Sequence, residues 1–160
     1  MFIFIQLIIF QKNENINNPD HRKLIFDRIA KLTPDSNGQW GKMNVNQMLR
    51  HLSDALRMQW GEIEVKDKGN FITHTLLKRL TLVGMPPPKN AETFPEINEV
   101  ARGVNPDNFT KESETLISMI RRSLKIDKPF YHPLFGNMSV PQLGKLNYNH
   151  MNHHLKQFGV

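Results

Sequence analysis

Histidines with the spacing of metal ligands are the residues of this chain best suited to chemistry. His150 and His154 are four residues apart, so on a helix their imidazoles lie on one face, about one turn apart. One helix supplies two ligands to a single metal ion at this spacing. His51 borders the apolar stripe of an earlier helical segment and is the candidate for a third ligand. Three neutral imidazoles leave coordination positions open, as in catalytic zinc sites, where a bound water becomes a nucleophile near neutral pH.

The same residue types also have structural explanations. A His-x-x-x-His pair arises often by chance, and histidine near the C-terminus of a helix suits the helix dipole. His132 lies in an aromatic-rich loop, where it either supports a metal ligand or faces the substrate, or simply anchors the loop. Asp54, three residues after His51, either accepts a hydrogen bond from a ligand or pairs with Arg50 or Arg57. No catalytic residue beyond these candidates is assigned.

Apolar periodicity predicts helices separated by long loops, which would position these side chains. Asn18 followed by Pro19, Thr110, and Ser139 with Gln142 are the expected N-terminal caps. No repeats and no clear strand alternation appear outside the first ten residues. We therefore predict an all-α protein with four main helices, consistent with a four-helix bundle with long loops. The four main helices are expected over about residues 19–32, 44–60, 110–124 and 140–158, with a short additional helix over residues 73–83. The long loops 84–106 and 128–138 are expected to shape a pocket.

Composition limits the classes of function. The chain has 160 residues, enough for one domain, and no cysteine, which excludes disulfides, a cysteine nucleophile, cysteine-ligated zinc and iron–sulfur clusters. Its 21 Lys and Arg against 15 Asp and Glu give a net charge of +6. The basic residues are scattered and form no patch interleaved with aromatic residues, which argues against nucleic acid as a partner.

The first ten residues form an uncharged apolar run. A helix needs about 20 apolar residues to span a bilayer, so we expect no membrane span. The run also lacks the basic start and the cleavage site of a signal peptide. It is an extra strand or sticky tail, a degenerate signal, or a stretch upstream of the natural start, and we favour the last. We assign residues 1–16 to an N-terminal extension outside the core and residues 17–160 to the domain, and expect a cytoplasmic protein.

Several motifs occur together in the order seen in one group of metalloproteins. The chain resembles the DinB/YfiT-like superfamily of four-helix bundles with a three-histidine metal site, and is most similar to an uncharacterised DinB-like family of unknown function. The resemblance covers about residues 17–160. The matching motifs are Leu32-Thr33-Pro34-Asp35-Ser36, Trp40-Gly41-Lys42-Met43, Gln47-Met48-Leu49-Arg50-His51, Asp54-Ala55-Leu56-Arg57-Met58, His132-Pro133-Leu134-Phe135-Gly136 and His150-Met151-Asn152-His153-His154-Leu155-Lys156-Gln157-Phe158-Gly159.

This resemblance implies a site and a range of functions. It implies His51, His150 and His154 as ligands of a divalent metal, with zinc and nickel both expected. Characterised relatives include S-transferases and isomerases that use low-molecular-weight thiols. It thus implies a metal-dependent enzyme, a thiol-dependent S-transferase or a hydrolase, acting on a small-molecule substrate and forming a homodimer. The alternative is a non-catalytic DinB-like binding or stress-response bundle, so enzymatic activity stays an open question.

Overall fold

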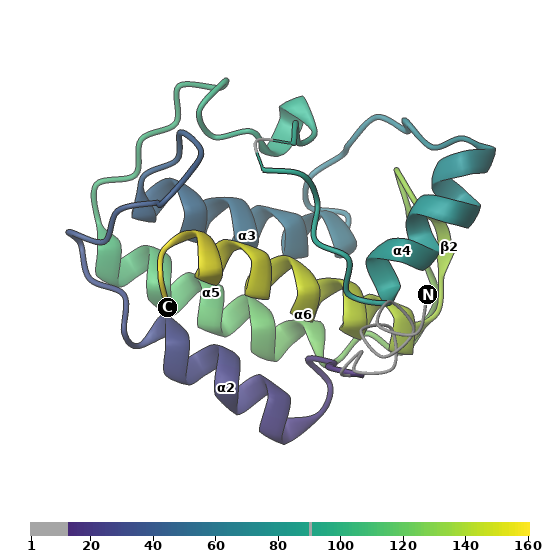
Figure 1. Ribbon diagram of the computed structural model, residues 1–160, viewed down its shortest axis with the longest axis horizontal. Coiled ribbons are helices and arrows are strands. Elements are labelled where there is room, and N and C mark those ends of the chain that lie inside the picture. Colours follow the sequence, from purple (N-terminus) through teal and green to yellow (C-terminus); the bar gives the residue numbers. More distant parts are fainter. Residues whose placement is uncertain (1–12, 90) are drawn as a thin grey trace, which may run out of the picture.

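A computed structural model describes residues 13–89 and 91–160, and this part of the chain is mostly helical (Figure 1). The helical class expected from the sequence is confirmed, with the addition of one short β-hairpin. The elements are α2 (Pro19–Ile29), α3 (Val45–Gln59), the π-helical turn η1 (Thr73–Leu77), α4 (Lys78–Leu82), the 3-10 turn η2 (Pro95–Ile97), α5 (Phe109–Ser123), β1 (Phe130–His132), β2 (Gly136–Met138) and α6 (Val140–Gln157).

Asparagine side chains cap the N-termini of three helices, where they accept hydrogen bonds from backbone N–H groups that have no partner within the helix. Asn18 Oδ1 accepts from the Asp20 N–H (2.8 Å), and Asn44 Oδ1 accepts from the Gln47 N–H (2.8 Å). The cap of α5 is Asn108, whose Oδ1 accepts from the Lys111 N–H (2.9 Å). The expectation of Thr110 at this cap was wrong, because the helix has already begun at Phe109 and Thr110 lies in its first turn.

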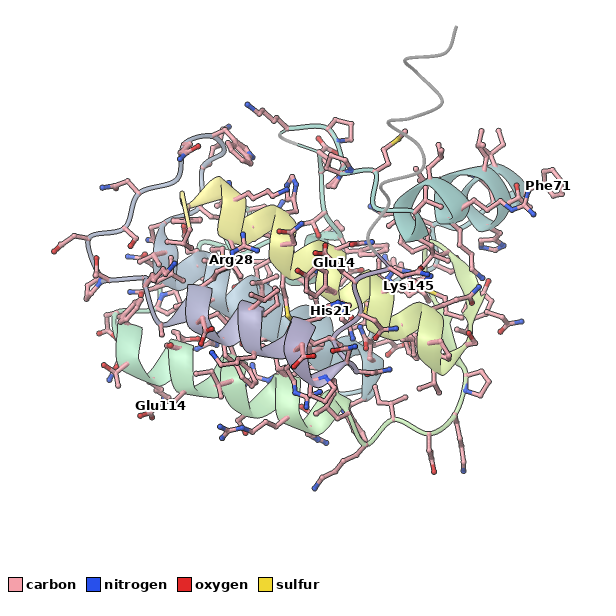
Figure 2. All side chains as sticks on the ribbon, turned by 60° about the horizontal axis from the view of Figure 1, so that its bottom comes forward. Glu14, His21, Arg28, Phe71, Glu114 and Lys145 are labelled. Atoms are coloured by element: carbon pink, nitrogen blue, oxygen red, sulfur yellow. The ribbon has the colours of Figure 1, made fainter. Side chains whose placement is uncertain are left out.

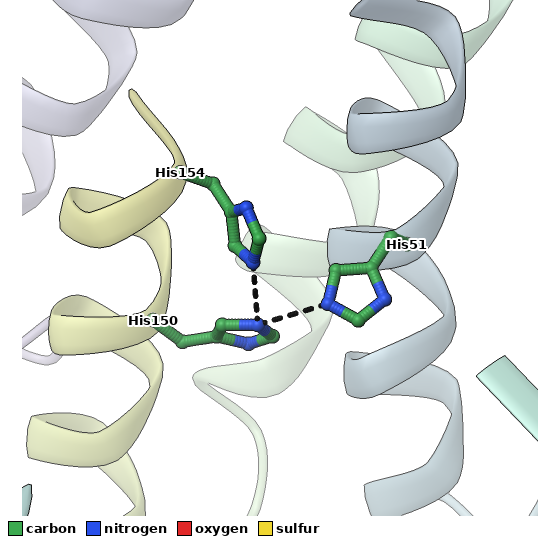
Figure 3. Close-up of side chains that lie close together, drawn as sticks. All are labelled: His51, His150 and His154. Atoms are coloured by element: carbon green, nitrogen blue, oxygen red, sulfur yellow. Dashed lines mark hydrogen bonds between the residues drawn. The ribbon is translucent and has the colours of Figure 1, made fainter. Parts of the chain in front are cut away.

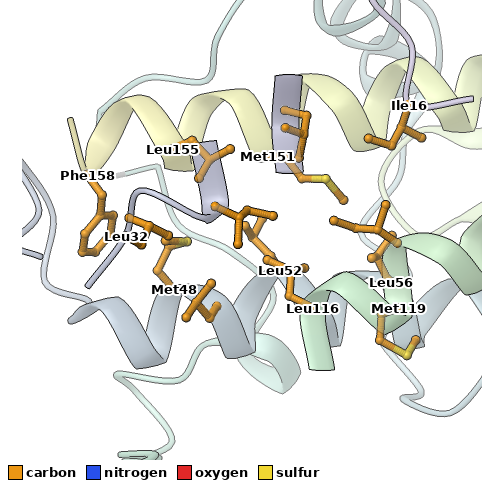
Figure 4. Packing of buried hydrophobic residues seen from close by; sticks show 14 of the residues in the cluster. Ile16, Leu32, Met48, Leu52, Leu56, Leu116, Met119, Met151, Leu155 and Phe158 are labelled. Carbon is orange, nitrogen blue, oxygen red and sulfur yellow. The ribbon is translucent and has the colours of Figure 1, made fainter. Parts of the chain in front are cut away.

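The core lies between the four longer helices (Figure 4). Helix α3 packs along α5, and α6 contacts both α2 and α3. Burial of each large aliphatic side chain contributes about 1.5–3 kcal/mol, so this cluster holds α3 and α6 side by side. The two histidine-bearing helices are therefore fixed relative to each other. Fully buried members of the cluster are Ile16, Ile25, Ile29, Met48, Leu49, Leu52, Leu116, Ile120, Met151 and Leu155.

The hairpin and α4 close one end of the structure (Figure 1). β1 and β2 are antiparallel, with His132 opposite Gly136, and α6 begins directly after β2. Gly136 has a φ of +66°, which favours glycine, and a Cβ there would lie 3.2 Å from the His74 ring. The loop expected over residues 128–138 is thus partly a hairpin. Strands of three residues are too short to show the alternation that reveals a strand in a sequence.

The described part of the chain already packs on the core before residue 17. The Ile16 side chain is 1% exposed, and its N–H donates to the Gly144 carbonyl (3.1 Å). Asn15 Nδ2 donates to the Pro141 carbonyl (3.1 Å). Residues 15 and 16 thus contact α6, and the division into an extension over residues 1–16 and a domain over residues 17–160 stays a prediction. The interpretations of residues 1–12 lie outside the described residues.

No helix in the described ranges is long and apolar enough to cross a membrane.

Candidate metal centre

Three histidines from two helices, α3 and α6, point toward one another (Figure 3). His150 Nε2 lies 3.1 Å from the Nε2 of His51 on α3 and 3.1 Å from the Nε2 of His154. The candidate ligand atoms all lie within 4.8 Å of one another. The structure thus brings together the three residues selected from the sequence. His153, between the pair on α6, instead places its ring edge-on to Trp40, with 6.0 Å between ring centroids.

Two of the imidazoles are oriented by hydrogen bonds to their outer nitrogens. His51 Nδ1–H donates to the Ile97 carbonyl (2.9 Å), and His154 Nδ1–H donates to Gln157 Oε1 (2.8 Å). Gln157 is fixed in turn, because its Nε2 donates to the Trp40 carbonyl (2.6 Å). With the proton on Nδ1, the lone pair of each imidazole is on Nε2. Both lone pairs therefore point toward His150, the arrangement that carboxylate or carbonyl partners give to metal-binding histidines.

The donor set fits a divalent transition metal. His150 Nε2 carries one proton at most, whereas two acceptor nitrogens lie 3.1 Å away from it. A cation bound by all three lone pairs would satisfy every nitrogen at once. Ligand nitrogens about 2.0–2.1 Å from one zinc ion are about 3.3 Å apart in a tetrahedral site. The two N–N distances are close to this value, and imidazole suits zinc and nickel.

Burial keeps these histidines neutral. Burial lowers the pKa of His51, and it lowers the pKa of His150 well below the ordinary value, with a further contribution from the neighbouring His154. Burial and the charge of His51 lower the pKa of His154 to about 3. At neutral pH all three imidazoles are therefore unprotonated at one nitrogen and free of positive charge. A metal ligand must be in this state.

The outer partners were not found from the sequence. Gln157 lies three residues after His154, so its position on the same face of the helix was readable as a signal. The Ile97 carbonyl gives no such signal, because any residue has a carbonyl. Its contact with His51 depends on how the loop over residues 84–106 crosses α3. Within that loop the 3-10 turn η2 presents the carbonyl to the imidazole.

Asp54 pairs with Arg57, which is the second of its two expected roles. Its Oδ1 accepts from Arg57 (2.7 Å), and its Oδ2 lies 3.7 Å from Arg102 on the loop after η2. Arg50, the other expected partner, instead makes two hydrogen bonds to Glu112 on α5 (2.7 and 2.5 Å). Asp54 therefore helps to attach the η2 loop to α3, and it supports the His51 contact only through that loop.

Glu99 lies beside the contact between Asp54 and Arg102. We expect the protein to become more stable when the Glu99 carboxylate is replaced by a neutral side chain. The Glu99 side chain is 1% exposed and 3.4 Å from Arg102. Burial and the negative charge of Asp54 raise its pKa to about 6. A raised folded-state pKa means that stability is greatest below the ordinary pKa near 4.5 and falls as the pH rises through 6. We expect Glu99→Gln to raise the free energy of unfolding at pH 8 by about 1–2 kcal/mol, measured by urea denaturation.

Glu96, three residues before Glu99, provides a control. Hydrogen bonds from the backbone lower its pKa, so its ionised form is favoured in the folded protein. Glu96→Gln should therefore give no gain at pH 8. Equal stabilities of Glu99→Gln and the wild type at both pH 5 and pH 8 would contradict the assigned shift.

His132 is buried in the hairpin beside the site. Its Nδ1 accepts from the backbone N–H groups of Leu134 (3.1 Å) and Phe135 (3.3 Å), so its proton lies on Nε2. Its ring lies 4.8 Å from that of Phe135 and 6.2 Å from that of Phe94. These contacts give His132 the loop-anchoring role, one of its two expected roles. A role toward the substrate stays a prediction.

The chain matches no protein-family model, no curated protein and no solved structure. The resemblance to the DinB/YfiT-like superfamily, and the four-helix bundle that it implies, therefore stay predictions.

Proposed function

We propose that His51, His150 and His154 bind one divalent metal ion, zinc or nickel, and that the protein is a metal-dependent enzyme acting on a small molecule. The observation that carries the proposal is the convergence of three neutral imidazoles, two of them oriented by outer hydrogen bonds. A histidine that merely fills a core has no need of two like neighbours 3.1 Å from the same nitrogen. The cost of burying three polar rings is offset when they share a cation.

The residues around the centre have distinct tasks in this proposal. When bound, a divalent ion supplies a Lewis acid that lowers the pKa of a water or thiol placed on it. The Ile97 carbonyl and Gln157 hold His51 and His154 in the ligating orientation. His132 is close enough to His150 to affect its pKa, and its neutral ring carries an Nε2–H donor and lies 6.2 Å from the Phe94 ring.

The reaction proposed is transfer of a low-molecular-weight thiol to an electrophile, with hydrolysis as the second reaction of the same centre. Both use a metal-activated nucleophile, and the resemblance to DinB-like proteins favours the first. A non-catalytic binding or stress-response bundle is the alternative function. In that case the histidines serve stability alone, and replacing them changes the melting temperature with no turnover to lose.

Turnover by metal-loaded protein tests the proposal. Protein stripped with a chelator and reloaded with zinc or nickel is assayed with glutathione, bacillithiol or mycothiol and a chromogenic electrophile, and with an ester for hydrolysis. We expect turnover only in the loaded protein, its loss in His150→Ala and its retention in His153→Gln. Metal binding without turnover in any assay would favour the non-catalytic alternative, and absence of metal binding would overturn the site itself.

A further inference from the structure

Two amide side chains join the histidine-bearing helices close to the candidate metal centre. Gln59 Nε2 donates to Asn147 Oδ1 (2.6 Å), and Asn147 Nδ2 donates to Gln59 Oε1 (3.1 Å). Each amide uses one donor and one acceptor on the other, so the two hydrogen bonds close a ring. Asn147 lies three residues before His150 on α6, and Gln59 lies eight residues after His51 on α3. We call Gln59 and Asn147 the amide pair.

The amide pair occupies positions where apolar side chains would be expected. Asn147 is buried in the apolar stripe of α6, four residues after Leu143 and four before Met151, which are both buried. On α3, the half-buried Gln59 continues the stripe that contains the buried Leu56. Replacing both partners of a hydrogen bond by apolar groups of the same shape is often neutral or stabilising. Stability of the fold therefore does not explain why both positions are polar.

The amide pair is the hydrogen-bonded connection between α3 and α6 that does not involve a candidate ligand. Within the described ranges, the two helices are otherwise hydrogen-bonded only through the contact between two of the candidate histidine ligands. Other side chains of α6 connect it to different helices. Asn149 Nδ2 donates to the Thr81 carbonyl on α4 (2.8 Å), and Asn152 Oδ1 accepts from Arg28 on α2 (2.8 Å; Figure 2).

Directional bonds fix how far one helix is shifted along another. The apolar core holds α3 and α6 side by side, but burial of apolar surface has no direction, whereas a hydrogen bond requires defined distances and angles. A single buried polar side chain fixes the register of packed helices in coiled coils. Register is important at this site because metal–ligand distances vary by only about 0.2 Å. A small shift of α6 would move His150 and His154 together, away from their positions relative to His51.

We propose that Gln59 and Asn147 are positioning residues of the metal centre. Their paired amides set the register of α6 on α3, and this register brings His51 within ligand distance of His150 and His154. The inference rests on the metal site proposed above, to which it adds two residues that are not ligands. It predicts that substitutions of the amide pair separate metal affinity from stability.

Zinc affinity and stability of the full chain test the proposal. In the double variant Gln59→Met and Asn147→Leu, apolar side chains of similar size replace both amides. We expect the metal-free double variant to have a urea midpoint equal to or above that of the wild type. Its zinc affinity, measured by competition with a coloured chelator, should be at least about tenfold weaker.

Exchanging the two amides provides a rescue. The double variant Gln59→Asn and Asn147→Gln keeps both amides and their combined length, so it should restore most of the zinc affinity. Asn149→Leu is the matched control, because it removes a hydrogen bond between α6 and α4 and leaves the amide pair intact. This control should bind zinc as tightly as the wild type.

Three results would overturn the role of the amide pair. They are wild-type zinc affinity in the apolar double variant, a loss of affinity there only in proportion to a loss of stability, and affinity in the folded exchanged pair as weak as in the apolar variant. Weak zinc binding by Asn149→Leu would also count against it, since any interhelical bond of α6 would then have the same effect. Absence of zinc binding by the wild type would overturn the metal site itself, and this inference with it.

Discussion

Replacing His150 with alanine is expected to abolish stoichiometric metal binding. Wild-type protein purified without a histidine tag should contain about one zinc or nickel ion per chain, measured by elemental analysis. His150 has the largest expected effect of the three, because its Nε2 is the atom that lies 3.1 Å from both other nitrogens. Without it, two imidazoles remain on different helices, and a site of two protein ligands binds zinc too weakly to survive purification.

Two further variants separate ligation from helix stability. His153→Gln changes a histidine on the same helix that contacts Trp40, and it should keep the full metal content. Gln157→Leu removes the acceptor of the His154 Nδ1–H and leaves all three candidate ligands in place. We expect it to weaken metal affinity by about 10–100-fold, the usual cost of losing an outer partner. Full metal content in His150→Ala, or its loss in His153→Gln, would overturn the three-histidine site.

The second large effect expected is a loss of stability in acid. In the unfolded chain each histidine binds a proton near its ordinary pKa of 6.5, whereas burial lowers the pKa of His132 to about 4 and that of His154 to about 3. Between these values the unfolded state binds more protons than the folded state. The stability contributed by the neutral rings is therefore complete above pH 6.5 and is lost progressively as the pH falls below it.

The expected size of this effect follows from the same shifts. Each buried histidine costs about 1.4 kcal/mol per pH unit below 6.5, so that His132 and His154 each cost about 2 kcal/mol at pH 5. Glu99, with its pKa raised to about 6, opposes this trend between pH 6 and 4.5, but it is a single group against several. Urea denaturation of metal-free protein at pH 7.5 and pH 5 should show a net loss of several kcal/mol.

A single substitution checks the assignment. In His132→Gln the amide oxygen takes over as acceptor for the Leu134 and Phe135 N–H groups, and the side chain no longer titrates. We expect the slope of stability against pH to fall by about one proton between pH 6 and 4.5. An unchanged slope would show that His132 is accessible to protons in the folded protein.

Local sequence features predicted the helices of this protein well. Asn18 and the Ser139–Gln142 pair cap α2 and α6 as expected, because a cap requires only residues within one turn of each other. Two expectations were wrong because the local sequence signal was ambiguous or absent. They are the cap at Thr110 and the loop expected where the hairpin forms. Asn108 and Thr110 are both good caps, and three-residue strands carry no readable period.

In the candidate site too, the local feature could be predicted from the sequence and the long-range contact could not. The sequence by itself determined that His150 and His154 share one face of a helix, because an interval of four residues is close to one helical turn. It also singled out His51, but no interval relates His51 to residues about a hundred positions later. The 3.1 Å approach of His51 to His150 was decided by the packing of α3 against α6.

Only the tertiary structure determined the outer partner of His51 and the exposed side of α4. The Ile97 carbonyl reaches His51 because the η2 loop is attached to α3 through Glu99, Asp54 and Arg102. One side of α4 is exposed because the opposite side packs on α6 and the hairpin. Periodicity shows that a helix has an apolar side, but only the packing of distant elements decides which side is covered. Local geometry follows from the chain's own dihedral angles, whereas these contacts depend on the free energy of the whole fold.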